Sequence, residues 1–207
     1  MKYVLLAVLW ILFCVLHSGL ISIRFSAFAK RALGSGYRFY RLFYNIFAVV
    51  TLIPVVLYSH SLKQQPFFVW NGHLFIGKWI LIITGVSLFI LGARHYSMSV
   101  FMGIAQIREK SGHALISRSD TIDSTGILGL VRHPLYAGIF PLLWAQNLDT
   151  STLITNIVLS VYVIVGTFLE ERKLVIEFGE EYRNYRKRVS MFFPVKWIYL
   201  RCKRLFF

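Results

Sequence analysis

Five runs of mostly apolar residues alternate with shorter polar segments along this chain of 207 residues. A helix needs roughly 20 apolar residues to cross the hydrocarbon core of a bilayer, because each residue adds about 1.5 Å along its axis. Four runs approach or reach that length, at residues 3–23, 42–60, 74–92 and 152–169. A shorter run covers residues 135–147. The pattern predicts an all-α, polytopic membrane protein with about five transmembrane helices.

The last two runs and the segment behind them form a distinct region. Only residues 147–151 separate the two runs, which predicts a tight helical hairpin. Behind it, apolar residues recur every three to four positions between charged ones: Leu174, Val175, Phe178, Tyr182, Tyr185 and Val189. This spacing predicts an amphipathic tail helix over residues 172–189, which we expect at the cytoplasmic membrane interface. We interpret residues 1–207 as one domain, with three spans in 1–93 and the hairpin with its tail helix in 120–195.

Composition supports a membrane protein and argues against other classes. The chain is 57% hydrophobic and 15% charged, whereas soluble domains carry about 25% charged residues. A net charge of +14 would suggest a nucleic-acid partner in a soluble protein. Here the basic residues lie between apolar runs, so we expect a lipid bilayer and no nucleic acid. Cys14 and Cys202 are isolated, which gives no support for a disulfide framework or a metal site.

The basic residues also predict an orientation. Twenty of the 23 Lys and Arg residues lie in the segment after the first run, in the segment between the third and fourth runs, and in the tail. The opposite side carries only Lys2, Lys63 and Lys78. Because cytoplasmic segments are enriched in Lys and Arg, the N-terminus is expected outside and the C-terminus in the cytoplasm.

A polar motif precedes the short run: Arg132-His133-Pro134-Leu135-Tyr136. Pro134 suits the first turn of a helix, so Arg132 and His133 are expected at its N-terminal end, where unpaired N–H groups favour an anion. Counted along the helical rise from the shared turn, both would lie roughly 10 Å deeper in the bilayer than Glu170. Charged groups at such depth need opposite charges, water or a charged ligand. Glu170 and Glu171 are the candidate opposite charges.

This arrangement admits two interpretations. A recessed pocket with cations at its floor and carboxylates at its rim would suit a zwitterionic ligand. Alternatively, an Arg–Glu ion pair only fastens the hairpin. His17 and His95 raise a similar choice, because two histidines inside a bundle could ligate a haem, whereas polar contacts between helices are the simpler interpretation. Asp120 and Asp123 are expected to cap a helix or loop.

A longer series of motifs resembles a known superfamily. Arg132-His133-Pro134-x-Tyr136 is followed by the apolar hairpin, Glu170-Glu171, Phe178-Gly179-x-x-Tyr182-x-x-Tyr185-x-x-Arg188-Val189 and Pro194. In order and spacing, residues 120–195 resemble the isoprenylcysteine carboxyl methyltransferase and phospholipid methyltransferase superfamily of integral membrane enzymes.

The resemblance implies a membrane methyltransferase that uses S-adenosyl-L-methionine as methyl donor. It implies a donor site with these residues: Ile122, Leu128, His133, Pro134, Tyr136 and Glu170. Arg132 and Glu171 are then the candidate catalytic residues, and Glu171 is a candidate general base for an acceptor that must lose a proton.

Gly166 bears on the methyl acceptor. Prenylcysteine carboxyl methyltransferases carry an arginine one turn before the first glutamate, where this chain has Gly166. Residues 166–172 look more like the bacterial small-thiol methyltransferase branch, and His17-Ser18 points the same way. A small or lipophilic acceptor, most simply a thiol, is therefore expected. A prenylcysteine carboxylate or a phospholipid amine is an alternative, and a non-catalytic haem-binding or transport component is the alternative from another class.

Overall fold

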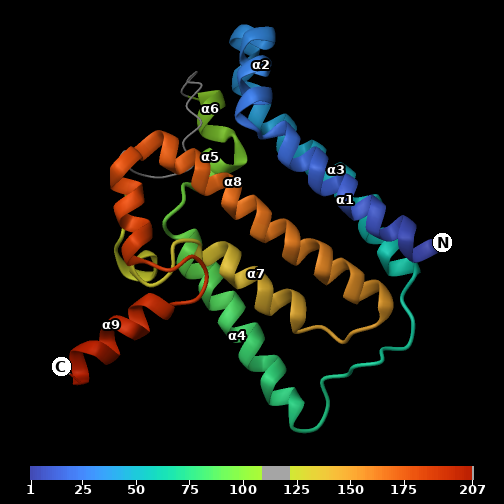
Figure 1. Cartoon of the computed structure of the whole chain (residues 1–207). Coiled ribbons are helices and arrows are strands. Elements are labelled where there is room, and N and C mark those ends of the chain that lie inside the picture. Colours follow the sequence, from blue (N-terminus) through green and yellow to red (C-terminus); the bar gives the residue numbers. More distant parts are fainter. Residues whose placement is uncertain (109–121, 207) are drawn as a thin grey trace. The chain divides into compact units, whose positions relative to one another are not determined.

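The structure is a computed structural model that describes residues 1–108 and 122–206. The described residues form helices, which confirms the all-α prediction (Figure 1). In chain order these are α1 (Lys2–Leu20), α2 (Ile23–Leu33), η1 (Gly34–Phe39), α3 (Tyr40–Ser61), α4 (Leu74–Ala93), α5 (Met98–Met102), α6 (Ile104–Arg108), η2 (Gly126–Gly129), α7 (Pro134–Trp144), α8 (Thr150–Arg188) and α9 (Val195–Phe206). Isolated bridges pair Phe68 with Leu148 and Val131 with Ser190.

The chain is a multi-pass membrane protein. Among the described residues, four helical stretches are long and apolar enough to cross a membrane: Lys2–Leu20, Ile23–Ser61, Leu74–Ala93 and Thr150–Arg188. The helix α7 is apolar but has only 11 residues, or about 16 Å of helical rise. That is roughly half of the hydrocarbon thickness. The short fourth run of the sequence is therefore a short helix.

The first helix ends earlier than predicted. It stops at Leu20 rather than at residue 23, and α2 begins at Ile23. The reason is Ser22, whose hydroxyl oxygen accepts a hydrogen bond from the Phe25 N–H at 3.3 Å. A serine in this position satisfies one of the free N–H groups at the start of a helix, and thus favours a new helix over continuation of the old one.

Contacts group the chain into two compact units. The first comprises Met1–Val69, Tyr96–Ile116 and Asn147–Tyr162, and the second Trp70–His95, Ser117–Gln146 and Val163–Phe207. The third predicted span, α4, thus groups with α7 rather than with the first two spans. That residues 1–207 form one domain stays a prediction.

In the first unit, α1 packs on α3 through an apolar core that includes Leu6, Trp10 and Val55. Polar groups add specific contacts. His17 Nε2 lies 2.7 Å from the Tyr44 hydroxyl, so His17 makes the polar helix–helix contact that we expected. Asp149 accepts hydrogen bonds from the N–H groups of Gln64 and Thr152, both at 2.8 Å. Burial raises the pKa of Asp149, but these hydrogen bonds outweigh it and hold the pKa below its usual value.

In the second unit, α4 and α7 approach closely at glycines. A Cβ atom on Gly85 would lie 2.7 Å from Leu142 Cγ and 2.9 Å from the Gly138 carbonyl oxygen. A Cβ atom on Gly92 would lie 3.0 Å from the Leu135 nitrogen. Small residues allow membrane helices to pack backbone against backbone. This contact fixes the end of α4 beside the first turn of α7.

The tail helix is a continuation of α8 rather than a separate element. α8 bends at Gly179, whose φ of 55° lies in the left-handed region that glycine adopts without steric cost. Behind the bend, α8 turns back (Figure 1). Tyr182, Tyr185 and Val189 are buried there and pack with Ile122. The chain itself thus covers this part of the apolar face, and the location of the helix at the cytoplasmic interface stays a prediction.

Candidate functional site

A cluster of buried polar side chains lies in the second unit, where the start of α7 meets α8. Arg132, His133 and Glu171 are only 8%, 3% and 2% exposed. Arg132 donates to Glu171 Oε1 from Nε at 2.7 Å and also from Nη2. His133 Nε2 lies 3.3 Å from the same oxygen. Since an unpaired charge would be costly at this burial, the guanidinium and the carboxylate depend on each other.

Arg132 also binds the C-terminal end of α8. Its Nη1 donates to the carbonyl oxygen of Val189 and, at 3.3 Å, to that of Arg186. The last carbonyls of a helix lack partners within the helix. One guanidinium thus caps α8 and binds the Glu171 carboxylate, an arrangement that favours a positioning role for Arg132.

The segment before α7 lies alongside the segment after α8. The Arg132 N–H donates to the Ser190 carbonyl at 2.8 Å, and the His133 N–H donates to the Met191 carbonyl at 3.2 Å. The backbone amides of Arg132 and His133 therefore already have partners. Arg132 contacts Glu171 directly, so the cation and the carboxylate meet in one cluster. The offset in depth from Glu170 stays a prediction.

His133 combines a charged contact with an aromatic one. Its ring stacks on that of Tyr136, with centroids 5.8 Å apart and planes at 22°. Pro134 is the first residue of α7, as predicted. Among the described residues, His133 Nδ1 is buried without a hydrogen-bond partner. Because buried polar atoms are usually hydrogen-bonded, His133 Nδ1 is a candidate to bind a ligand group.

The two glutamates differ sharply in their surroundings. Glu171 is buried, and its Oε2 atom forms an ion pair with Arg186 Nε at 3.1 Å. Glu170 is half-buried, and the described part of the chain offers it no hydrogen bond or ion pair. Glu171 is thus the carboxylate that Arg132 neutralises.

The predicted residues before α7 lie against the end of α8. Ile122 packs on the cluster of Tyr182, Tyr185 and Val189. The Tyr185 hydroxyl donates to the Leu128 carbonyl at 2.6 Å. The structure therefore brings the Ile122 and Leu128 segment to the helix end that Arg132 caps. Their contact with a donor stays a prediction.

Sequence reasoning missed two members of the cluster. Arg186 binds Glu171, and the Tyr182 hydroxyl lies 3.5 Å from Glu171 Oε1. Both fall within the pattern of the predicted amphipathic tail helix. Their spacing of four residues places them on one helix face. An arginine on the apolar side of that pattern was the signal for a buried acidic partner.

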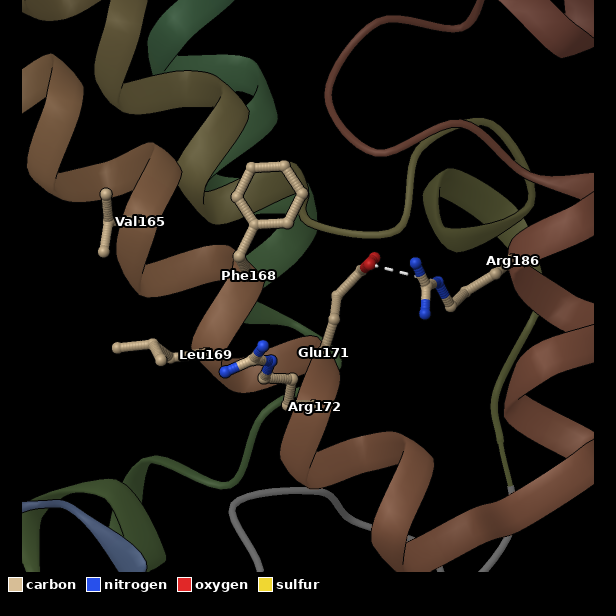
Figure 2. Close-up of a pocket in the computed structure, with 6 residues that line it drawn as sticks. All are labelled: Val165, Phe168, Leu169, Glu171, Arg172 and Arg186. Atoms are coloured by element: carbon tan, nitrogen blue, oxygen red, sulfur yellow. Dashed lines mark ion pairs between the residues drawn. The ribbon is translucent and has the colours of Figure 1, made fainter.

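A hollow of about 380 Å³ lies beside Glu171, and Figure 2 shows this carboxylate pointing from α8 toward Arg186. The lining residues are Val165, Phe168, Leu169, Glu171, Arg172 and Arg186. The volume lies within the usual range for small-molecule sites, about 300–1,000 Å³. Gly166 belongs to the same stretch, and a Cβ atom there would meet nothing within 4 Å. The glycine therefore leaves open space rather than meeting a packing demand.

The second predicted histidine, His95, lies just after α4. Its Nδ1 atom lies 2.7 Å from Asp123 Oδ2. The other carboxylate oxygen of Asp123 accepts hydrogen bonds from the Thr125 hydroxyl at 2.7 Å and the Thr125 N–H at 2.9 Å. These Thr125 contacts, followed by the one from His95, hold the pKa of Asp123 below its usual value. Asp123 thus caps a loop as predicted, whereas Asp120 lies outside the described residues.

Comparison with known proteins places these features in a family. The family described as NnrU protein matches residues 5–200. The chain is 35% identical over 120 residues to methanethiol S-methyltransferase 1 of Bradyrhizobium diazoefficiens, covering 56% of this chain and 38% of that protein. It is 29% identical over 195 residues to the methanethiol S-methyltransferase of Crocosphaera subtropica, covering 88% and 71%.

A relative from the other predicted branch also matches. The chain is 32% identical over 101 residues to the protein-S-isoprenylcysteine O-methyltransferase of Schizosaccharomyces pombe, covering 46% of this chain and 39% of that protein. The superfamily resemblance inferred from the motifs is thereby confirmed. The chain spans 25% to 50% of the length of the Pseudomonas relatives and of the first Bradyrhizobium relative that it matches. No solved structure matches the chain at a significant level.

Proposed function

Because the chain belongs to the NnrU protein family and resembles both thiol and isoprenylcysteine methyltransferases, we propose that it is an integral membrane methyltransferase that uses S-adenosyl-L-methionine. The observation that carries this proposal is the buried cluster of Arg132, His133 and Glu171, in which His133 Nδ1 has no hydrogen-bond partner among the described residues. When bound, S-adenosyl-L-methionine supplies a methyl group on a sulfonium sulfur, and the acceptor takes this methyl group as the neutral sulfide leaves.

The chain offers groups that match this donor. The Glu170 carboxylate would bind the cationic end of S-adenosyl-L-methionine. His133 Nδ1 would accept a hydrogen bond from an N–H group of the same molecule. Tyr136, Ile122 and Leu128 would supply apolar and aromatic surface. Arg132 and Glu171 would hold His133 in place through the contacts described above. The protein's main contribution is then to align donor and acceptor, an effect that is large for a displacement reaction.

A thiol is the acceptor class that the site favours. A carboxylate acceptor in a low-dielectric site needs a fixed cation, since its desolvation is otherwise unfavourable. Gly166 supplies only open space where the prenylcysteine branch carries an arginine. Arg132 already binds Glu171 and the end of α8, which leaves it a poor replacement. A thiol binds as a neutral molecule and makes no such demand.

A competition assay tests the acceptor. With equal concentrations of a farnesylated cysteine analogue and a small alkyl thiol, we expect thioether formation to dominate over methyl ester formation. Methyl ester formation at least about tenfold faster would refute the thiol assignment, because that ratio corresponds to about 1.4 kcal/mol in favour of the carboxylate. The variant Gly166→Arg is a matched probe, since the space is open, and it should move the ratio toward the ester.

Donor binding is tested without turnover. Calorimetric titration of the purified protein with S-adenosylhomocysteine should show saturable binding. A visible absorption spectrum of the same sample distinguishes a methyltransferase from a haem-binding protein. A Soret band together with no S-adenosylhomocysteine binding would replace the methyltransferase with a haem-binding protein.

The orientation is a further part of the proposal. The N-terminus is assigned to the outside and the C-terminus to the cytoplasm, on the basis of twenty basic residues on one side and three on the other. A reporter fused after Phe207 should behave as cytoplasmic, and one inserted near Gln65 should behave as external. The reverse pattern of reporter activity would contradict this topology.

A further inference from the structure

We propose that His95 and Asp123 form the general base that accepts the proton of the acceptor thiol. This inference rests on the proposed thiol methylation and assigns a residue to a step that the donor site leaves open. A neutral thiol is a weak nucleophile, because the thiolate is the reactive form. The proton must therefore have a destination near the acceptor.

The carboxylate at the centre of the cluster is poorly suited to receive that proton. Arg132 donates to Glu171 Oε1 through two nitrogens, and Arg186 forms an ion pair with Oε2. Two guanidinium groups stabilise the charged form of a carboxylate and thereby weaken it as a base. The neighbouring His133 directs Nε2 at the same Oε1 atom. The Glu171 carboxylate and His133 Nε2 thus already bind other members of the cluster.

The His95–Asp123 pair has the geometry of an oriented base. Asp123 Oδ2 lies 2.7 Å from His95 Nδ1, which favours the tautomer with the proton on Nδ1. In that tautomer Nε2 carries the free lone pair, and the described residues offer it no hydrogen-bond partner. The side chain of His95 is 22% exposed, so a ligand can reach it. Asp123 is itself held in place by Thr125.

The pair also lies at the end of the second unit where the proposed methyl-donor site lies. A Cβ atom on Gly126 would lie 3.9 Å from His95 Nε2, which places this nitrogen beside η2. Two residues further along, the Leu128 carbonyl accepts the Tyr185 hydroxyl bond. Three residues before His95, Gly92 packs on the first turn of α7, next to His133. The base therefore lies at the same end of α4 and α7 as the proposed donor site.

In the proposed step, the S–H bond of the thiol breaks, and its proton moves to His95 Nε2. The sulfur lone pair forms a bond to the methyl carbon, and the bond between that carbon and the sulfonium sulfur breaks, with its electron pair staying on the departing sulfur. Asp123 stabilises the imidazolium until His95 releases the proton to water.

The test uses the full-length protein and two thiols of different acidity. One is an alkyl thiol that is mostly protonated near neutral pH, and the other an aromatic thiol that is largely ionised. For His95→Asn, we expect alkyl thiol methylation to fall by about 100-fold, within the usual range for general bases. Aromatic thiol methylation should fall by no more than about threefold, because its proton is already lost. S-adenosylhomocysteine affinity, measured by calorimetry, should not change.

Two further variants separate catalysis from loop structure. Asp123→Asn keeps an oxygen for Thr125 but presents an amide N–H to His95 Nδ1, which reverses the tautomer, so it should lose alkyl thiol activity like His95→Asn. Thr125→Val removes the hydroxyl contact and leaves the pair, so it should retain selectivity between the thiols. Equal losses with both thiols, or unchanged rates for His95→Asn, would overturn the assignment. If the wild type binds S-adenosylhomocysteine but methylates neither thiol, the proposed thiol activity is refuted. The assignment of His95 and Asp123 as its general base is then refuted as well.

Discussion

The variant Arg132→Met should be less stable than the wild type by about 3–5 kcal/mol, because it leaves the Glu171 carboxylate buried without its main partner. It also removes the cap on the end of α8. The measurement is reversible unfolding of the full-length protein in detergent, with S-adenosylhomocysteine binding assayed on the folded fraction. This is the largest stability effect that we expect from a single side chain.

A double variant provides the control. In Arg132→Met with Glu171→Leu, no unpaired charge is left buried, and replacement of a buried ion pair by apolar residues is often nearly neutral. Much of the lost stability should return, whereas donor affinity should stay low because His133 has lost its oriented partner. If the double variant recovers donor binding together with stability, the ion pair only fastens the fold.

The variant Glu170→Gln should bind S-adenosyl-L-methionine about ten- to a hundredfold more weakly than the wild type. The reason is the loss of a charge-assisted hydrogen bond to the cationic end of the donor, worth about 1.5–3 kcal/mol. Stability should change little, because Glu170 has no hydrogen bond or ion pair in the described part of the chain. Calorimetry and unfolding on the same preparation separate the two effects.

Glu177→Gln is the matched control, since it removes one negative charge from an exposed position on the same helix. Its donor affinity should equal that of the wild type. If a folded Glu170→Gln protein binds the methyl donor as tightly as the wild type, another carboxylate binds the cationic end. If both variants lose the same donor affinity, the loss reflects net charge and not a specific contact of Glu170.

Sequence reasoning worked where a single local rule decides the outcome. Apolar runs of sufficient length marked α1, α3 and α4, and Pro134 marked the first residue of α7. Ser22 follows an equally local rule, but the continuous apolar run around it concealed the cap. Membrane helices are thus readable from sequence, whereas their exact ends depend on individual hydrogen bonds.

Contacts over long sequence separations were only partly accessible. The pairing of Arg132 with a glutamate follows from burial of charge, but the choice of Glu171 over Glu170 depends on the rotation of α8. The bend at Gly179 decides whether Tyr182 faces lipid or protein. The φ angle of a glycine within a helical pattern cannot be predicted from the sequence. His95 and Asp123 are 28 residues apart, partly across residues that the structure does not describe, and share no sequence pattern.

The Arg132 contacts also bear on how the chain inserts into the membrane during synthesis. Glu171 follows Arg132 by 39 residues and Val189 by 57, so the ribosome makes the charge well before its partners. At about 5–20 residues per second, the delay before Val189 is roughly 3–11 s. Glu171 is the carboxylate that neutralises Arg132, and an arginine in the membrane without such a partner is unfavourable. We therefore expect the segment that leads into α7 to reach its final position only after Glu171 and the end of α8 have been made.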